Sequence, residues 1–179
     1  VPWGVVSLTE SCADEGDSRE SRLARYADMR ARVAESFAEF AARIGGAREE
    51  AREAGSLRLL GTSGTVTTLA SLHLDLPQYD RRAVDGLTVP AASMRDISTR
   101  LSAMSPAERR ELPCIGRERA DLVVAGCAIL ETILDLWPAE SLGVADRGIR
   151  EGILRSMMTA GSAGERLRTA MRQRLQAGA

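Results

Sequence analysis

The stretch SLRLLGTSGTVTTLASL, from Ser56 to Leu72, constrains the fold more than any other part of this chain. An apolar run at 57–60 leads directly into Gly-Thr-Ser-Gly-Thr at 61–65, and apolar residues then recur at helical spacing from Val66. This order predicts a strand, a tight turn and a helix. We therefore expect an α/β fold, rich in helices, that is organised around this turn.

The predicted turn is suited to binding an anion. Glycine permits close backbone approaches that a Cβ would prevent, and the start of a helix leaves several N–H groups without intrahelical acceptors. Such a turn can bind phosphate or the polar edge of a nucleotide, but Gly, Ser and Thr also occur at helix starts simply as caps. Both interpretations stay open. The candidate phosphate-binding residues are Gly61, Thr62, Ser63, Gly64 and Thr65.

All 24 basic residues are arginine, and the formal net charge of the 179 residues is −1. The absence of lysine excludes a Walker A lysine, a Schiff base and a lysine general base. Any side-chain cation that binds phosphate must therefore be an arginine, whose fork can make bidentate contacts. The near-neutral charge gives no general argument for binding to DNA or to an anionic membrane.

Three cysteines, Cys12, Cys114 and Cys127, are far apart and show no C-x-x-C spacing. We expect reduced thiols in a cytoplasmic protein. There is no leader pattern, and no apolar run approaches the roughly 18 to 20 residues of a membrane span. The chain begins with Val1 rather than methionine, so we expect a piece of a longer protein.

Periodicity along the chain predicts the remaining elements. We expect strands near Val5, Leu59 and Val144, with exposed strand edges. A long helix should follow residue 17 and be interrupted at Gly45-Gly46. A second helix should span about 91–104. Residues 120–136 are apolar on nearly all sides and predict a buried central helix, in which Gly126 implies the close approach of another backbone.

A second strand–turn–helix pattern occurs at Asp146-Arg147-Gly148, within DRGIREG. Arg147 and Arg150 lie at the predicted helix start, where cations are unfavourable unless an anion or an acidic side chain lies nearby. Asp146 and Glu151 can supply that partner locally, and a bound substrate is the alternative.

Several motifs, in the same order, resemble the Ppx/GppA phosphatases, which are exopolyphosphatases and guanosine pentaphosphate phosphohydrolases. They are GTSGTVTTLA, HLDLPQYDRRAVDGLTV, SPAERRELPCIGRERADLVVAGCAILETIL and VADRGIREGIL. The similarity runs from about Val5 to about Met158. It implies the actin-like ATPase superfamily, in which two related domains close over a substrate, and it matches the second domain only. We expect that domain at 1–160 and a terminal helix or tail at 161–179.

The resemblance implies that the parent protein hydrolyses terminal phosphoanhydrides of polyphosphate or guanosine pentaphosphate, as in the stringent response, with Mg²⁺ and a carboxylate-activated water. The family's glycine-rich phosphate loop, its catalytic carboxylate and its metal ligands are expected in parts outside this chain, so no catalytic residue is assigned here. The resemblance adds Arg119 as a phosphate contact and places Arg147 and Glu151 at the interdomain cleft. We expect the isolated chain to be inactive.

Other functions stay open. The same superfamily includes kinases, which transfer the phosphoryl group to an acceptor. A non-catalytic module that only binds an alarmone is also compatible with the residues. The sequence does not choose between polyphosphate and guanosine pentaphosphate, and it leaves open whether the protein forms a homodimer.

Overall fold

The computed structural model describes residues 2–12 and 16–159. It contains two compact units, Val1–Asp146 and Arg147–Ala179. The described part of the second unit includes one helix, at 149–159. The tail expected at 161–179 lies outside the described residues.

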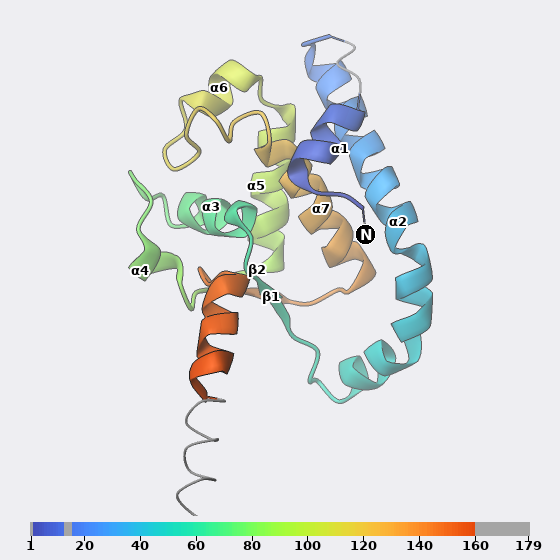
Figure 1. Cartoon of the computed structure of the whole chain (residues 1–179). Coiled ribbons are helices and arrows are strands. Elements are labelled where there is room, and N and C mark those ends of the chain that lie inside the picture. Colours follow the sequence, from blue (N-terminus) through green and yellow to red (C-terminus); the bar gives the residue numbers. More distant parts are fainter. Residues whose placement is uncertain (1, 13–15, 160–179) are drawn as a thin grey trace, which may run out of the picture. The chain divides into compact units, whose positions relative to one another are not determined.

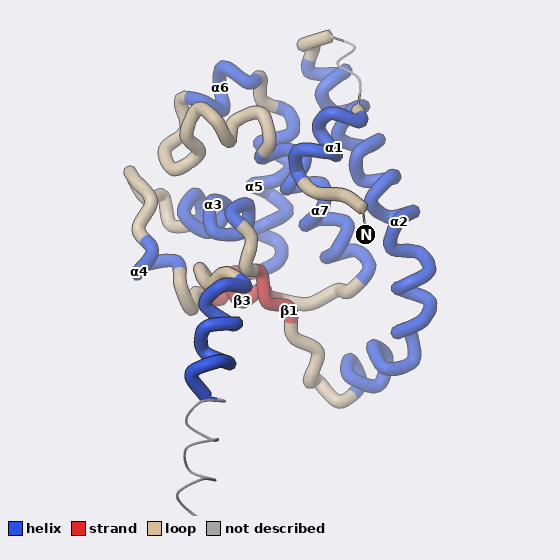
Figure 2. Tube along the Cα trace, viewed as in Figure 1, coloured by secondary structure: helices blue, strands red, loops and turns tan. Residues whose placement is uncertain are grey.

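The first unit contains a small mixed sheet with the strand order β1-β3-β2 (Figure 2). Strand β1 (Leu59–Gly61) pairs in parallel with β3 (Ser141–Val144), and β2 (Thr88–Pro90) pairs antiparallel with β3. The strands expected near Leu59 and Val144 are confirmed, and the structure adds β2. Strands β1 and β2 form the edges of the described sheet, and Leu60 of β1 is 68% exposed.

The predicted strand near Val5 is wrong, because this segment is a helix, α1 (Val5–Ser11). The Ser7 hydroxyl accepts a hydrogen bond from the Gly4 N–H at 3.0 Å and so caps the helix start. Leu8 is fully buried. The adjacent β-branched residues favoured a strand locally, but capping and burial of one helical face decide the conformation.

Helix α2 (Arg19–Glu53) is the longest described helix and is capped by Ser18, whose hydroxyl accepts from Ser21 N at 3.1 Å. The predicted interruption at Gly45-Gly46 is wrong, since the helix continues through both residues. Glycine costs only about 1 kcal/mol per helical position. Tertiary contacts offset this, including a 2.8 Å hydrogen bond from Arg48 Nη1 to Leu136 O.

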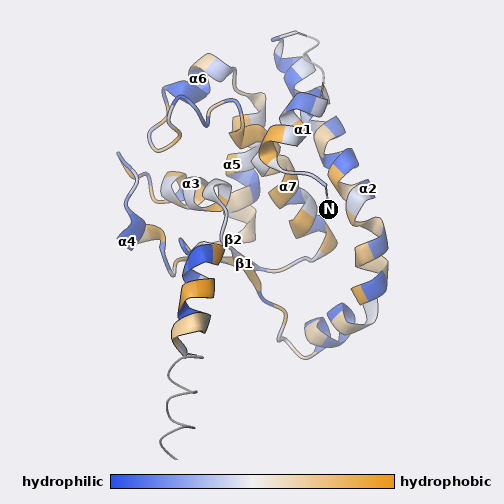
Figure 3. Ribbon diagram, viewed as in Figure 1, coloured by the Kyte–Doolittle hydropathy of each residue, from blue (hydrophilic) through white to orange (hydrophobic). Residues whose placement is uncertain are grey.

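Helix α7 (Val123–Leu136) is the buried centre of the first unit, as predicted, although it starts three residues later than expected. It packs against α1, α2, α3 (Gly64–His73) and α5 (Ala91–Ala103) (Figure 1). Much of its length is hydrophobic (Figure 3). The close approach at Gly126 comes from the side chain of Thr65, so the expectation of a neighbouring backbone is corrected.

Two short helices complete the first unit: α4 (Arg81–Val84) and α6 (Pro106–Arg110). Helices α3 and α5 pack on the sheet, where Val89, Leu142 and Val144 are buried. The buried core between these helices and the sheet fixes the position of the β1–α3 turn.

Candidate functional site

The predicted strand–turn–helix is present: β1 is the strand, α3 is the helix, and the turn joins them. Ser63 is the N-cap of α3, and its hydroxyl accepts a hydrogen bond from Val66 N at 3.3 Å. The backbone N–H groups of Gly64 and Thr65 have no acceptor among the described residues. These two donors lie at the positive end of the helix dipole, which favours a bound anion.

Two close contacts hold this turn in place. A Cβ at Gly61 would lie 2.7 Å from Val66 Cγ2, so glycine allows the first turn of α3 to fold back over the strand end. A Cβ at Gly126 would lie 2.1 Å from Thr65 Oγ1. The Thr65 side chain is therefore directed at α7, which leaves its backbone N–H as the group that can serve a ligand.

Arg119, which the family resemblance implied as a phosphate contact, lies beside the turn. A Cβ at Gly64 would lie 3.6 Å from Arg119 Nη1 and 3.8 Å from its Cζ. Both residues are exposed to solvent. Within residues 2–12 and 16–159 the Arg119 guanidinium makes no hydrogen bond or ion pair. The structure thus places an available cation next to two available backbone donors.

The neighbouring strand end, after β3, carries Asp146, for which the sequence suggested only a local arginine partner. Because β1 and β3 are parallel, their carboxyl ends meet at one edge of the sheet, and Ala145 N donates to Gly61 O at 2.9 Å. Asp146 accepts a hydrogen bond from the Tyr79 hydroxyl at 2.7 Å and pairs with Arg81 Nε at 3.1 Å. Partial burial and the bond to Asp146 raise the pKa of Tyr79.

Asp146 pairs with Arg81, a partner that the sequence analysis did not name. Tyr79 and Arg81 belong to a segment with many turn-forming residues, and nothing in its local pattern pointed to a contact with Asp146. The ion pair with Arg81 and the hydrogen bond from Tyr79 fix the position of the Asp146 carboxylate. We therefore assign it a structural role and not that of a general base.

Arg147 and Glu151 belong to the second unit, whereas the turn and Arg119 belong to the first. Glu151 Oε2 accepts a hydrogen bond from Gly148 N at 2.6 Å. This bond caps the start of helix 149–159. The proposed role of these two residues at a cleft stays a prediction.

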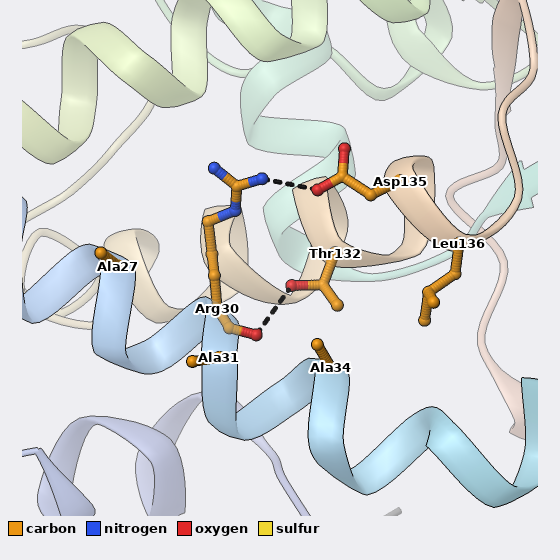
Figure 4. Close-up of a pocket in the computed structure, with 7 residues that line it drawn as sticks. All are labelled: Ala27, Arg30, Ala31, Ala34, Thr132, Asp135 and Leu136. Atoms are coloured by element: carbon orange, nitrogen blue, oxygen red, sulfur yellow. Dashed lines mark hydrogen bonds and ion pairs between the residues drawn. The ribbon is translucent and has the colours of Figure 1, made fainter.

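A separate pocket of about 280 Å³ lies between α2 and α7 (Figure 4). Its arginine, Arg30, pairs with Asp135 at 2.5 Å and with the buried Glu131 at 3.3 Å, and Asp135 also pairs with Arg95 at 2.7 Å. These carboxylates already neutralise the pocket's positive charge. The pocket is therefore a poor site for phosphate.

A larger groove, of about 750 Å³, runs beside the sheet between the end of α2 and β1. It is lined by Leu57, Leu59 and Leu60 from the strand side, with Arg58 and Glu140 among its polar residues. None of the predicted site residues lines it.

The described residues contain no cluster of three or more His, Cys, Asp or Glu that could hold a metal ion. Asp146, two residues after the end of β3, is occupied by Tyr79 and Arg81. This part of the chain therefore does not fit a magnesium site of its own. No helix in the described ranges has the length and apolar character needed to cross a membrane.

Comparison with known proteins supports the sequence resemblance. The sequence profile of the Ppx/GppA phosphatase family matches residues 1–160. Exopolyphosphatase 2 of Mycobacterium tuberculosis is 28% identical over 102 residues, which cover 55% of this chain and 32% of that protein.

Solved structures show the same fold. The Ppx/GppA family member of Aquifex aeolicus superposes with a TM-score of 0.68 at 22% identity, covering 90% of this chain and 48% of that one. An exopolyphosphatase-like protein gives a TM-score of 0.67 at 26% identity, covering 84% and 47%. The predicted helix-rich α/β, actin-like fold is confirmed. The chain spans about half the length of these solved relatives.

Proposed function

Because this chain belongs to the Ppx/GppA phosphatase family, we propose that its complete protein is a cytoplasmic hydrolase that releases terminal phosphate from polyphosphate or guanosine pentaphosphate. In this reaction the oxygen of water bonds to the terminal phosphorus and the bond to the bridging oxygen breaks. The shortened substrate leaves with that electron pair. The turn at residues 61–65 and Arg119 bind the terminal phosphate.

One observation carries the proposal: the Arg119 guanidinium lies beside Gly64, at a helix start where two N–H donors have no acceptor in the described part of the chain. Backbone donors and an arginine fork together supply the hydrogen bonds and charge that a phosphoryl group needs. The pair also explains why a chain without lysine can still bind phosphate.

Cleavage needs more than this turn supplies. Phosphoryl transfer requires a positioned water, a carboxylate that orients it and metal or arginine charge around the transferring group. Magnesium, when bound, would neutralise charge on the phosphates. We propose that its ligands and the catalytic carboxylate come from the rest of the protein, and that the 179-residue chain alone binds phosphate weakly without turnover.

The test compares phosphate release by the complete protein, the isolated chain and an Arg119→Gln variant of the complete protein. Losing a charged hydrogen bond of about 1.5–3 kcal/mol should lower kcat/KM by about 10- to 100-fold. Arg117→Gln is the matched control, because it removes the same charge from the same exposed loop.

Each other outcome has a definite meaning. Phosphate release that is unchanged by Arg119→Gln would refute the role of the turn. Turnover by the repurified isolated chain would refute the division of labour. Transfer of labelled phosphate to a sugar acceptor would identify a kinase, and binding by the complete protein without turnover would identify an alarmone-binding module.

A further inference from the structure

Arg109 is the largest fully buried side chain in the described part of the protein, with 1% exposure. It lies on the short helix α6. Among the described residues its guanidinium makes no ion pair with a carboxylate, and its hydrogen bonds go to the backbone carbonyl oxygens of Leu101, Met104 and Ala120. Burial lowers the pKa of this arginine. Burying a cation without a carboxylate partner costs free energy, because the charge loses its hydration. The hydrogen bonds of Arg109 must offset this cost.

Two of these hydrogen bonds cap a helix. Arg109 Nη1 donates to Met104 O at 2.6 Å and to Leu101 O at 3.4 Å, at the C-terminal end of α5. Carbonyl groups at a helix end have no intrahelical partner, and a cation there is favoured by the helix dipole.

The remaining bond reaches a different segment. Arg109 Nε donates to Ala120 O at 2.7 Å, and Ala120 directly follows Arg119 in the chain. The connection from Glu111 to Leu122 contains no helix or strand, and its backbone turns through positive φ at Cys114 (68°) and Gly116 (62°). Local hydrogen bonds form the turns of this segment, among them Leu122 N and Val123 N to Arg119 O at 3.1 and 2.8 Å, and the bond from Arg109 ties these turns to α6.

We propose that Arg109 is a positioning residue for phosphate binding. Its bond to the Ala120 carbonyl fixes the backbone on one side of Arg119, while Arg119 N and Ala120 N both donate to Gly116 O at 3.2 Å on the other. Together these bonds hold the Arg119 guanidinium beside Gly64. This inference rests on the proposed function, because it assumes that Arg119 binds phosphate.

The test is a double-mutant cycle in the complete protein, with tripolyphosphate affinity measured by calorimetry. Arg109→Met keeps the apolar stem and removes every donor, and Arg109→Lys keeps the charge but loses the fork. We expect Arg109→Met to weaken binding by about 10-fold and Arg109→Lys by less, in line with the loss of a well-placed charged hydrogen bond. In an Arg119→Gln background, neither substitution should weaken binding further.

Controls separate positioning from general stability. Val33→Ala, in the buried face of α2, removes core packing far from the loop and should lower the free energy of unfolding without changing affinity. If Arg109→Met does not fold, Arg109→Lys and Arg109→Gln complete the cycle, because each keeps a nitrogen that can donate hydrogen bonds.

The outcomes distinguish the two hypotheses. If Arg119→Gln leaves affinity unchanged, the proposed function fails and this inference fails with it. If Arg119→Gln weakens binding but the Arg109 variants do not, only the positioning role is overturned. The same conclusion follows if the Arg109 variants weaken binding by an equal factor with and without Arg119.

Discussion

Replacing Gly126 by alanine tests whether packing of α3 on α7 sets the position of the turn at residues 61–65, which we propose binds phosphate. The added Cβ would lie 2.1 Å from Thr65 Oγ1 and 2.9 Å from Thr65 Cβ. Rotation about χ1 moves the hydroxyl but not the Cβ, so the two backbones must separate by at least about half an ångström to reach carbon–carbon contact. Overpacking costs about 1–3 kcal/mol, and alanine recovers about 1 kcal/mol of helix propensity.

We therefore expect the free energy of unfolding of Gly126→Ala to fall by up to about 2 kcal/mol. Urea denaturation measures this change directly. The displaced turn should also bind tripolyphosphate roughly 10-fold more weakly, because small misplacements of binding groups are costly.

Gly46→Ala is the matched control, since no heavy atom lies within 4 Å of a Cβ added there. It should stabilise α2 by about 1 kcal/mol and leave affinity unchanged. If Gly126→Ala is stabilised as much as Gly46→Ala and binds normally, the argument from packing is refuted.

Three further predictions concern single sites. Gly64→Val should weaken tripolyphosphate binding by about 10-fold, since its methyl groups project toward the Arg119 guanidinium; unchanged affinity in a folded variant would argue against this site. Although burial alone would raise it, hydrogen bonds from two arginines lower the pKa of Asp135. The resulting stability is present above the unfolded pKa of about 3.9 and is lost as pH falls through the folded pKa. Asp135→Asn should therefore make the free energy of unfolding depend less on pH in acid, by less than about 1 kcal/mol because this side chain is exposed. An acid transition that is the same in Asp135→Asn and in the unmodified protein would contradict this prediction. Burial raises the pKa of Cys127 to about 12, so Ellman's reagent at pH 8 should modify the half-buried Cys114 first; faster labelling of Cys127 would show that α7 opens.

The central turn could be predicted from sequence because its determinants are local. The apolar strand, the Ser63 cap and the helical periodicity lie within a few residues of one another, and the structure confirms them. The predicted strand near Val5 was wrong because its conformation is not decided locally. Two adjacent valines favour a strand, but burial of Leu8 against distant helices makes the segment a helix, α1.

Contacts between distant segments could not be read from periodicity. Arg119 and Gly64 are far apart in sequence, and although the family resemblance implied a phosphate contact for both, only the structure shows that they lie side by side. The Tyr79–Asp146 bond and the three-residue strand β2 also depend on partners remote in the chain. Gly126 was expected to admit a neighbour, but a glycine does not reveal whether that neighbour is a backbone or, as here, a threonine side chain.

Among the described residues, the contacts noted above for the proposed phosphate-binding turn lie inside the first unit. Gly61 accommodates Val66, Gly126 accommodates Thr65, and the loop that carries Arg119 is held by buried hydrogen bonds. Binding groups fixed in this way need no rearrangement when the phosphate arrives, which reduces the entropic cost of binding. Hydrolysis needs more than binding, because the water, the carboxylate that orients it and the metal must all meet at the same phosphoryl group. Phosphate binding and phosphate release should therefore be separable properties, with the first set by the packing of α3 on α7 and the second by the rest of the complete protein.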